Sequence, residues 1–476
     1  MLAGWWTPRG PLTTAAALAA MALSLAVGAV AGLALRSRWA MLIAPVAYVV
    51  VFELTRWDFS GPTVDAIRLD STYAIMVMVV GRGVHGVLAL LPMVLGAAVG
   101  AAIARRGLVG SPRKVGVGTQ LATALRRSVA VLTGFVLVAV AVFVSRPGYT
   151  EPIIDAGGRA VAGSVAELTS LQINGHELAL MIRGRSTRNP VLLFLAGGPG
   201  GSEFGAMRNH SQALEDDFVV ATFDQRGTGK AYGQLDPTST LTLDGAVDDV
   251  VDVTEYLRER FGQDRVYLVG QLWGTILGVL AVQRRPQLYR AFVGAGQMVS
   301  PQATDQVYYR DTLAWARDNG NTNLVDTLTR IGPPPYTRVR DYEPTLSHEY
   351  EVYPYDHTGN SEGSGGMTEN IFVEEYSLLD TVHVLAGFLD TFAVLYPQIQ
   401  NVDLRVQATR VDVPVYLAQG RHETPGRAGP AQQWFDLLQA PHKELVVIDN
   451  AGHRPLWERP QEFTELMTGT VLRLTQ

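Results

Sequence analysis

Residues that could support nucleophilic catalysis occur where an apolar run, Val266–Val269, gives way to Gly-Gln-Leu-Trp-Gly and then to an apolar helical pattern. This order is typical of a nucleophile elbow, a sharp turn from a strand into a helix whose central residue is strained. Glycines two positions before and after that residue, here Gly270 and Gly274, remove side chains that would otherwise collide. An attacking serine would stand at the centre, where this chain has Leu272. An ordinary strand end flanked by glycines is the alternative interpretation.

A glycine-rich turn follows an earlier apolar run, in the segment Leu193–Ser202. Such a turn exposes backbone N–H groups. We expect the N–H of Gly197 or Gly198, together with that of Trp273, to stabilise the oxyanion of a tetrahedral intermediate, a contribution of roughly 3–4 kcal/mol per donor. A phosphate-binding loop is the alternative, but neither a GK[ST] ending nor GxGxxG spacing follows to favour it.

A third motif, Asp-Gln-Arg-Gly-Thr-Gly-Lys at positions 224–230, closes another apolar run. We interpret it as a structural element that shapes the floor of the site. Asp224 and Arg226 are expected to satisfy each other or nearby backbone groups. No chemical step is assigned to this motif.

A sheet whose strands alternate with helices is needed to position these motifs. After Val165, short β-rich runs alternate with helix-like segments, which is an α/β rhythm. The later runs are continuously apolar, as expected when helices cover both faces of a parallel sheet. Eight strands are predicted: Leu168–Ile173, Glu177–Ile182, Val191–Leu195, Phe218–Phe223, Val266–Val269, Ala291–Gly294, Val415–Ala418 and Leu445–Ile448.

A long insertion separates the sixth and seventh predicted strands, and we interpret it as a cap. Its Gly/Ser/Asn-rich stretch, His357–Gly366, is expected to form a mobile surface loop. The predicted boundaries are a membrane block at 1–147, a linker at 148–164, the first part of the catalytic core at 165–298, the cap at 299–405 and the second part of the core at 406–476.

The three motifs, in this order, resemble the prolyl aminopeptidase (proline iminopeptidase) family of α/β-hydrolases, whose marks are HGGPG, DQRGxGxS and GxSxGG/T. The resemblance covers roughly Val165 to the C-terminus and extends to tripeptidyl-type relatives that release short peptides from N-termini. It implies an α/β-hydrolase fold with an eight-stranded, mostly parallel sheet, a helical cap and a Ser/acid/His triad in chain order.

This resemblance assigns three positions. Leu272 takes the nucleophile position, Glu423 the acid position after the seventh strand, and His453, in a Gly-His turn after the eighth strand, the base position. A structural histidine and a surface carboxylate are the alternatives for the last two, and the neighbouring His422 matches no triad role. The departures from the family pattern are Ala196 for His, Ala231 for Ser, Glu423 for Asp and Leu272 for Ser.

Leu272 decides the expected activity, because a hydrocarbon side chain cannot attack a carbonyl. Loss of the serine from such a triad typically lowers turnover by on the order of 10⁶. Neither Ser202, in the glycine-rich turn, nor Thr275, about one helical turn beyond the elbow, is positioned to replace it. We therefore expect this chain to be inactive or severely impaired. A recent substitution and an inherited pseudoenzyme both remain open, and the retained triad partners and glycines favour recent descent from a working hydrolase.

Paired carboxylates in the cap, Glu374 and Glu375, are candidates for binding the free α-amino group of a substrate. The resemblance suggests this role, since aminopeptidases of this kind hold that group with carboxylates. Acidic residues that cap a helix start or are solvated are the alternative.

Four almost uncharged apolar stretches precede the catalytic region. A hydrocarbon core about 30 Å thick requires roughly 20 helical residues, so the first and third stretches are long enough, while the second and fourth are near the short limit. A signal peptide is the alternative for the first and a buried soluble helix for the second. The shorter run Tyr73–Val80 is expected to lie in the interface or to pack on the bundle. The four stretches are Pro11–Leu35, Trp39–Leu54, Val84–Ala104 and Ser128–Ser145.

Arginines predict the orientation of these helices. Arg36 and Arg38 join the first two stretches, and a larger basic cluster separates the third from the fourth, so both loops should be cytoplasmic. The N-terminus and everything after Arg146 should then lie outside, in a multi-pass protein of the plasma membrane. The basic cluster comprises Arg105, Arg106, Arg113, Lys114, Arg126 and Arg127.

Charge and composition exclude several functions. Residues 1–147 hold 13 basic and 4 acidic side chains, a net charge of +9, and the remainder holds 26 and 41, a net charge of −15. The basic part suits an anionic lipid bilayer, and the acidic part has no basic patch for nucleic acid. The absence of cysteine excludes disulfides, thiolate catalysis and Cys-ligated zinc. No cofactor or metal is predicted.

Two functional hypotheses follow. The first is an extracytoplasmic serine hydrolase for small peptide, aminoacyl or ester substrates, with activity lost or impaired through Leu272. The second is a non-catalytic protein that uses the capped pocket to hold a ligand or to serve as a membrane scaffold. The sequence identifies no protein partner.

Overall fold

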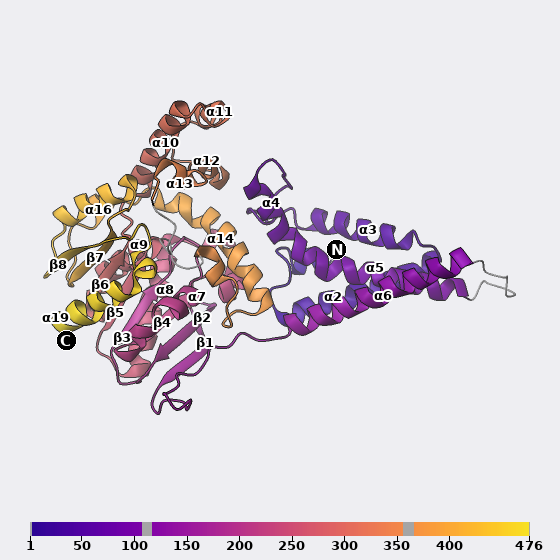
Figure 1. Ribbon diagram of the computed structural model, residues 1–476, viewed down its shortest axis with the longest axis horizontal. Helices are drawn as coiled ribbons and strands as arrows, with labels where there is room; N and C mark the ends of the chain where they lie inside the picture. The colour runs from indigo at the N-terminus through magenta and orange to yellow at the C-terminus, as the bar shows by residue number, and fades with distance from the viewer. Residues whose placement is uncertain (1, 107–116, 356–365, 476) are drawn as a thin grey trace. The chain divides into compact units, whose positions relative to one another are not determined.

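The computed structural model describes residues 2–106, 117–355 and 366–475, which form two compact units. Residues up to Gly148, together with Ser377–Val382, make the first, and Tyr149–Tyr376 with His383 onward make the second. The predicted loop His357–Gly366 lies outside the described residues except for Gly366. Figure 1 colours the chain from indigo to yellow, so that the N-terminal helices and the C-terminal strands are easily told apart.

The first unit is built from helices that coincide with the four predicted apolar stretches. Three of them are long and apolar enough to cross a membrane, as is the cap helix α14 (Leu378–Ile399), whereas α3 is shorter. Helix α6 begins before the predicted Ser128, because the polar residues that precede the apolar run continue the same helix. The helices are α1 (Leu2–Trp6), α2 (Thr14–Leu35), α3 (Ala40–Thr55), α4 (Thr72–Met78), η1 (Val79–Gly83), α5 (Val84–Arg106) and α6 (Val117–Val144).

The run Tyr73–Val80, expected to lie in the interface or to pack on the bundle, is continuous with the third apolar helix. It forms α4 and continues through the π-helical turn η1 into α5, giving one apolar helix over Thr72–Arg105. Gly81 in this turn lies so close to the chain that an added Cβ would be 2.1 Å from the carbonyl oxygen of Thr63. Arg82 of the same turn pairs with Glu53 of α3 at 3.1 Å. The helix thus begins at Thr72 and not at Val84, and the close packing of Gly81 and the ion pair of Arg82 stabilise its first turns.

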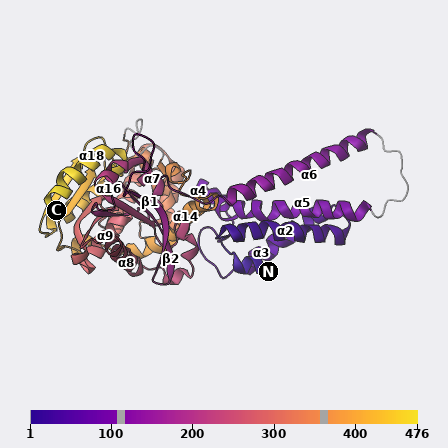
Figure 2. The same cartoon turned by 90° about the horizontal axis from the view of Figure 1, so that it is seen from below.

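Helices α2 and α5 run parallel and touch through their backbones (Figure 2). An added Cβ on Gly28 would lie 2.0 Å from the carbonyl oxygen of Met93, and one on Gly96 would lie 2.0 Å from that of Leu25. Gly32 and Gly100 make equivalent approaches one turn later, at 2.3 and 2.1 Å. Each helix thus contributes a GxxxG pair, the pattern by which apolar helices pack closely without a hydrophobic driving force.

The second unit contains one eight-stranded sheet in the order β1-β2-β4-β3-β5-β6-β7-β8, which confirms the predicted α/β-hydrolase fold (Figure 1). Strands β1 and β2 are antiparallel to each other, β2 is antiparallel to β4, and all later pairings are parallel. The strands are β1 (Val165–Ile173), β2 (His176–Gly184), β3 (Val191–Leu195), β4 (Val219–Asp224), β5 (Val266–Gln271), β6 (Tyr289–Ala295), β7 (Val415–Gly420) and β8 (Lys443–Ile448).

Helices cover both faces of this sheet, as the continuously apolar strands predict. One face packs against α7 (Phe204–His210) and the C-terminal helices α17 (Pro455–Glu458), α18 (Pro460–Glu465) and η8 (Leu466–Leu472). The other face packs against α8 (Leu243–Phe261) and α9 (Trp273–Arg284), where Gly278 of α9 lets the ring of Phe292 approach closely. The two-sided burial makes the core and fixes the strand ends that carry the motifs.

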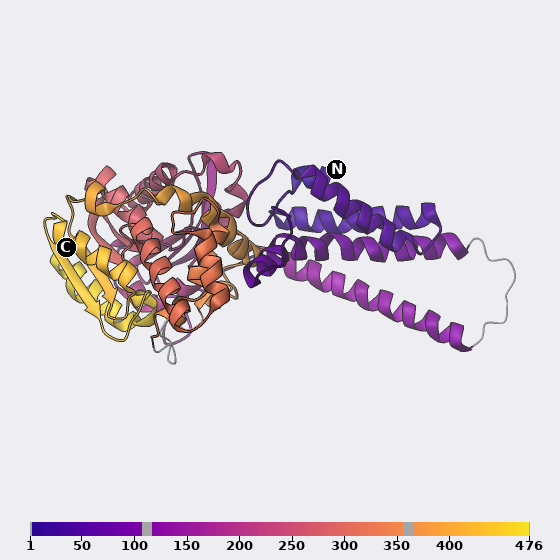
Figure 3. The same ribbon diagram turned by 90° about the horizontal axis from the view of Figure 1, so that it is seen from above.

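The insertion between β6 and β7 is helical and forms the cap (Figure 3). Its last long helix, α14, packs on the motif loops that follow β3 and β4, since the backbone of Gly387 lies against both Gly200 and Gly227. The described cap helices are α10 (Pro301–Asp318), α11 (Thr322–Ile331), η6 (Val339–Tyr342), α12 (Glu343–Leu346), α13 (Glu349–Val352), η7 (Gly366–Asn370), α14 (Leu378–Ile399) and α15 (Leu404–Gln407).

Candidate active site

The turn between β5 and α9 has the backbone geometry of a nucleophile elbow. Leu272 is the single residue between the strand and the helix. Its backbone angles, φ 52° and ψ −116°, are ones that residues other than glycine rarely adopt. An added Cβ on Gly270 would lie 2.4 Å from the carbonyl oxygen of Gly274, and one on Gly274 would lie 2.2 Å from that of Leu195. Both flanking glycines are therefore required by the turn.

Hydrogen bonds hold this turn in its strained conformation. The Leu272 N–H donates to the carbonyl oxygen of Ala295 at the end of β6, at 3.3 Å. The Thr275 hydroxyl donates to the carbonyl oxygen of Leu272 and accepts from the Met298 N–H at 2.9 Å. Thr275 is thus committed to the backbone of the elbow, in agreement with its exclusion as a substitute nucleophile.

The histidine and the glutamate expected as triad partners lie in direct contact. His453 Nδ1 and Glu423 Oε2 are 2.6 Å apart, in the turns after β8 and β7. His453 also borders the end of β6, because an added Cβ on Gly296 would lie 2.6 Å from its carbonyl oxygen. Its other ring nitrogen, Nε2, is buried and has no hydrogen-bond partner among the described residues. One side of the imidazole is therefore fixed and the other is free to interact.

Glu423 is surrounded by charged groups that favour its ionised form. Burial raises the pKa of its carboxyl, but the facing His453, the Arg427 guanidinium and the Thr424 N–H together lower that pKa to about 2. Arg427 Nη1 lies 3.5 Å from Glu423 and 2.7 Å from Glu349 of cap helix α13. The carboxylate opposite His453 is consequently charged over the whole physiological range, as an orienting acid requires.

The glycine-rich turn after β3 contains the two candidate oxyanion donors, Gly197 and Gly198, and one of them already has a hydrogen-bond acceptor. The N–H of Gly197 donates to the buried carboxylate of Glu203 at 3.1 Å. It is not available to an oxyanion in this geometry, so Gly198 is the remaining choice of the two in this turn. The predicted partner donor, Trp273, is the first residue of α9, directly after Leu272.

The side chain of Leu272 is directed toward the same turn. Its Cδ1 would lie 3.3 Å from a Cβ added to Gly197. The side-chain amide of the preceding Gln271 lies on the same side, with Oε1 only 2.3 Å from that Cβ position. The space in front of the glycine turn is thus lined by a hydrocarbon group at the position where a hydroxyl would be expected.

Comparison with known proteins places this geometry in a family. A family model described as alpha/beta hydrolase fold matches residues 190–460, more than half of the chain. A proline iminopeptidase of Xylella fastidiosa (strain Temecula1) is 32% identical over 313 residues, covering 62% of this chain and 93% of the relative. The chain belongs to the proline iminopeptidase-like α/β-hydrolases.

Two further proteins are similar to the hydrolase part of the chain. A probable aminopeptidase, YbaC of Bacillus subtilis (strain 168), is 27% identical over 307 residues, covering 64% of this chain and 96% of the relative. Among solved structures, a proline iminopeptidase-related protein from Thermus thermophilus is 20% identical, with a TM-score of 0.44, and covers 65% of this chain and 99% of the other.

Several residues that support the hydrolase site were missed by sequence reasoning. The Gln225 amide joins the two candidate oxyanion segments, since its Nε2 donates to the carbonyl oxygen of Ala196 at 3.2 Å and its Oε1 accepts from the Trp273 indole at 2.8 Å. Glu458 accepts from the N–H groups of Gly452 and Arg454 at 2.7 and 2.9 Å and so shapes the turn that carries His453. The only available signal for Gln225 was its place in the Asp-Gln-Arg-Gly motif.

Glu203 was also missed, although it follows the glycine-rich turn directly. Burial raises the pKa of its carboxyl, while Arg454 and the Gly197 N–H oppose that effect. It supports the backbone of the turn from behind. An acidic residue at the end of a glycine-rich loop was the signal that could have identified it.

Of the two cap glutamates, Glu375 does not present a free carboxylate, and Glu374 lies at the surface. Glu375 is buried and accepts from Arg208 Nε and from the Thr150 hydroxyl, both at 2.9 Å, so a cation already occupies its neighbourhood. Glu374 is exposed and its carbonyl oxygen accepts from the Tyr149 N–H. A substrate ammonium group would have to displace Arg208 to bind Glu375.

The third motif has the structural surroundings expected of it, but its two charged residues do not pair with each other. Asp224 accepts from the Lys230 N–H and from the Tyr376 hydroxyl, each at 2.8 Å. Arg226 donates to the carbonyl oxygens of Gln234 and Thr240 at 2.7 and 2.9 Å. Burial raises the pKa of Asp224 to about 7.

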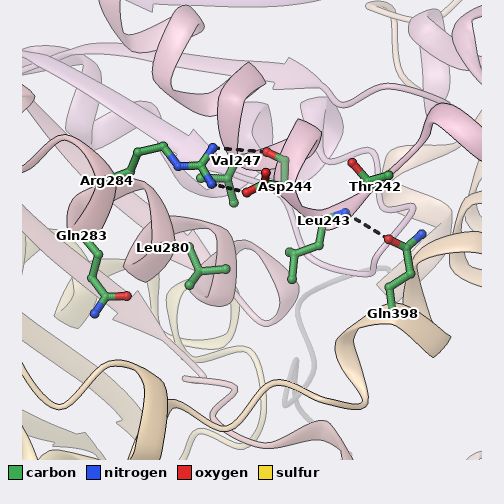
Figure 4. Close-up of a pocket in the computed structure, with 8 residues that line it drawn as sticks. All are labelled: Thr242, Leu243, Asp244, Val247, Leu280, Gln283, Arg284 and Gln398. Atoms are coloured by element: carbon green, nitrogen blue, oxygen red, sulfur yellow. Dashed lines mark hydrogen bonds and ion pairs between the residues drawn. The ribbon is translucent and has the colours of Figure 1, made fainter.

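A pocket of about 630 Å³ lies away from the candidate hydrolase site (Figure 4). It is formed where the start of α8 meets the end of α9, and its polar groups are already paired: Arg284 binds Asp244 and Asp248, and the Gln398 amide accepts from the Leu243 N–H. Leu280 to Arg284 follow Trp273 by 7–11 residues, or roughly 10–16 Å along the helix.

Among the described residues, no group of three or more His, Asp or Glu side chains could hold a metal ion.

Proposed function

We propose that this chain is a membrane-anchored, extracytoplasmic hydrolase of the proline iminopeptidase type in which Leu272 occupies the nucleophile position, with Glu423 as the acid and His453 as the base. The ligands that suit such a site are small peptides with a free N-terminus, aminoacyl compounds or short esters. The names of the relatives, an aminopeptidase and a proline iminopeptidase, support this class.

One observation carries the proposal. The imidazole of His453 is held through Nδ1 by Glu423 at 2.6 Å, while its buried Nε2 has no partner in the part of the chain that the structure describes. A buried polar atom without a hydrogen bond is unfavourable by roughly 1–3 kcal/mol and calls for an explanation. In a serine hydrolase this nitrogen accepts the proton of the nucleophile. We propose that the partner this nitrogen lacks is a hydroxyl at position 272.

Leu272 leaves the site without the group that would attack the carbonyl carbon. Substrate binding and any oxyanion stabilisation remain, but turnover is expected to fall by on the order of 10⁶. We therefore propose that the chain in its present form has little or no hydrolytic activity.

Leu272→Ser in the full chain tests the proposal. We expect the variant to react covalently with a fluorophosphonate and to hydrolyse aminoacyl and short ester substrates, because the serine hydroxyl would face His453 Nε2. The matched control is Leu272→Ala, which opens the same space without a nucleophile and should remain unreactive. Adding His453→Ala to Leu272→Ser should abolish the labelling. A folded Leu272→Ser protein that shows neither labelling nor turnover would contradict the catalytic part of the proposal.

A second candidate function is ligand binding without catalysis, and Leu272 itself favours it. The elbow, the glycine turn and the Glu423–His453 pair are kept while the nucleophile is absent. Calorimetry of the unchanged chain with a short peptide should then show binding without product formation. Binding that Leu272→Ser does not convert into turnover would support this candidate over the first.

We further propose that the helices of the first unit cross the membrane and that the hydrolase unit lies outside the cytoplasm. Three N-terminal helices of sufficient length and hydropathy support the anchoring. The arginines just after α2, at the end of α5 and in the first half of α6 support the sidedness. Because the chain has no cysteine, Ser37→Cys and Asp155→Cys each create a unique labelling site. In intact cells an impermeant maleimide should label position 155 and not position 37. The reverse pattern would overturn the orientation.

A further inference from the structure

The chain is fixed to the hydrolase unit almost immediately after the last apolar helix of the first unit. Helix α6 ends at Val144, and five residues later the Tyr149 N–H donates to the carbonyl oxygen of Glu374 at 2.8 Å. The next residue, Thr150, donates to Glu375 at 2.9 Å, and Arg183 donates to the carbonyl oxygen of Glu151 at 2.6 Å. The segment after α6 is thus bound to the cap and not free.

Ion pairs with little solvent exposure lie on both sides of this attachment. Arg183 pairs with Glu215 at 2.8 Å, and Arg208 pairs with Glu375 at 2.9 Å. An extended chain covers at most about 3.6 Å per residue, so Tyr149 stands no more than about 18 Å from the end of α6. This limit holds whatever the orientation of the two units.

Large apolar side chains are exposed at this point of attachment. Phe372 is 84% exposed and Tyr149 is 54% exposed, and both belong to the second unit. We name Tyr149 and Phe372 the apolar edge. Exposed aromatic residues are enriched where a protein meets the boundary between lipid headgroups and acyl chains.

The cap segment that carries the apolar edge continues to the candidate active site. Gly387 of helix α14 follows Phe372 by 15 residues. There the helix meets the glycine-rich turn, since an added Cβ on Gly200 would lie 2.9 Å from the carbonyl oxygen of Gly387. The Thr391 hydroxyl, one turn later, donates to the carbonyl oxygen of Gly227 at 2.7 Å.

We propose that the apolar edge inserts into the interface of the lipid bilayer, so that the cap segment that contacts the glycine-rich turn of the site begins at the membrane surface. This inference rests on the proposed membrane anchoring and goes beyond it. The partner is the boundary between headgroups and acyl chains, reached by apolar and aromatic side chains. The site would then receive ligands that are present at the bilayer surface.

The experiment uses the absence of cysteine from the chain. Phe372→Cys and Tyr149→Cys, each labelled with bimane, are placed as full-length protein in phosphatidylcholine nanodiscs with and without brominated lipid. Two matched labels serve as references. Phe135→Cys, 70% exposed on α6, reports insertion of the helices. Val406→Cys, 79% exposed on α15, reports a solvent-exposed apolar position on the hydrolase.

Val406 is a suitable reference because it lies at the opposite end of the sheet from Leu272. Its neighbour Gln407 accepts through its carbonyl oxygen from Gln283, near the end of α9, at 3.3 Å. We expect loss of fluorescence at 372 and 149, greatest with lipid brominated near the headgroup, deeper quenching at 135 and none at 406.

Two results would overturn the inference in distinguishable ways. Quenching at 135 with labels at 372 and 149 as unaffected as that at 406 would refute the apolar edge and leave the anchoring intact. Absence of quenching at 135 would refute the anchoring and the inference together.

Discussion

At position 272 the backbone is strained, but the side chain that it positions is a leucine, which cannot act as a nucleophile. A positive φ in a residue with a Cβ is unfavourable by roughly 1–3 kcal/mol and persists only where surrounding contacts impose it. The contacts of Gly270, Gly274 and Thr275 impose it here. In a catalytic elbow the strain exposes a nucleophile, whereas Leu272 keeps the strain without that use.

Leu272→Gly should therefore be more stable than Leu272→Ala, by about 1 kcal/mol, because only glycine adopts this conformation without a Cβ clash. Chemical denaturation of the full chain in detergent measures the difference. Asp326, exposed in the middle of α11, is the control position, where alanine should instead be more stable than glycine by roughly 0.5–1 kcal/mol. If the alanine variant were more stable than the glycine variant at both positions, the backbone of the elbow would not be strained.

At the scale of elements, two contacts between segments can be tested separately. Helices α2 and α5 approach through glycine backbones, and cap helix α13 is linked to Glu423 through Arg427. The first contact depends on the absence of side chains. The second depends on a buried cation placed between two carboxylates, Glu349 and Glu423.

Gly28→Ile should destabilise the helical unit by about 1–3 kcal/mol or more, because its Cβ would lie 2.0 Å from a carbonyl oxygen of α5. Gly134→Ile on α6, where no described atom lies within 4 Å of an added Cβ, is the matched control and should have little effect. Thermal unfolding in detergent compares the two variants. Equal losses of stability would argue against the close α2–α5 packing.

Arg427→Met should destabilise the hydrolase by roughly 3–5 kcal/mol, since it leaves Glu349 and Glu423 buried without their shared cation. The pKa of Glu423 should rise from about 2 as that cation is lost. The double variant Arg427→Met with Glu349→Gln removes one of the two carboxylates and should recover part of the loss. Denaturation curves of the three proteins measure this coupling, and strictly additive losses would contradict it.

The whole molecule has a pH dependence that its buried carboxyls dictate. Burial raises the pKa of Asp224 and of Asp305 to about 7, from an unfolded value near 3.8. Between these values the folded state binds more protons than the unfolded state, so the free energy of unfolding decreases as pH rises from about 4 to 7. Glu423 has the opposite sign, and its contribution is lost only as pH falls from about 4.5 toward 2.

We expect this decrease to be at most about 1.4 kcal/mol per pH unit for each of the two aspartates. Asp305→Asn should reduce the slope, because the amide, unlike the carboxyl of Asp305, takes up no proton when the chain folds. Denaturation of the full chain at several pH values measures it. Glu259→Gln, at an exposed position of α8, is the control and should leave the slope unchanged. An unaltered slope in Asp305→Asn would show that Asp305 does not titrate in this range.

The sequence by itself determined the elements and their order. Strand periodicity, Gly270 and Gly274, and the Gly-His turn at His453 are local signals, because glycine content and apolar runs restrict the backbone wherever they occur. The eight strands and the helical stretches could be predicted for that reason. The two GxxxG pairs in α2 and α5 were also readable but were overlooked, as was the continuity of α4 with α5.

Only the tertiary structure decided which polar groups meet. The bridging role of Gln225, the pairing of Glu375 with Arg208 and the pairing of Arg427 with Glu349 of the cap join residues from different elements. Buried polar groups must find partners, but spacing along the chain does not reveal which partner is nearest in space. The same reason applies to the attachment of Tyr149 to the cap, which lies more than 200 residues away in the sequence.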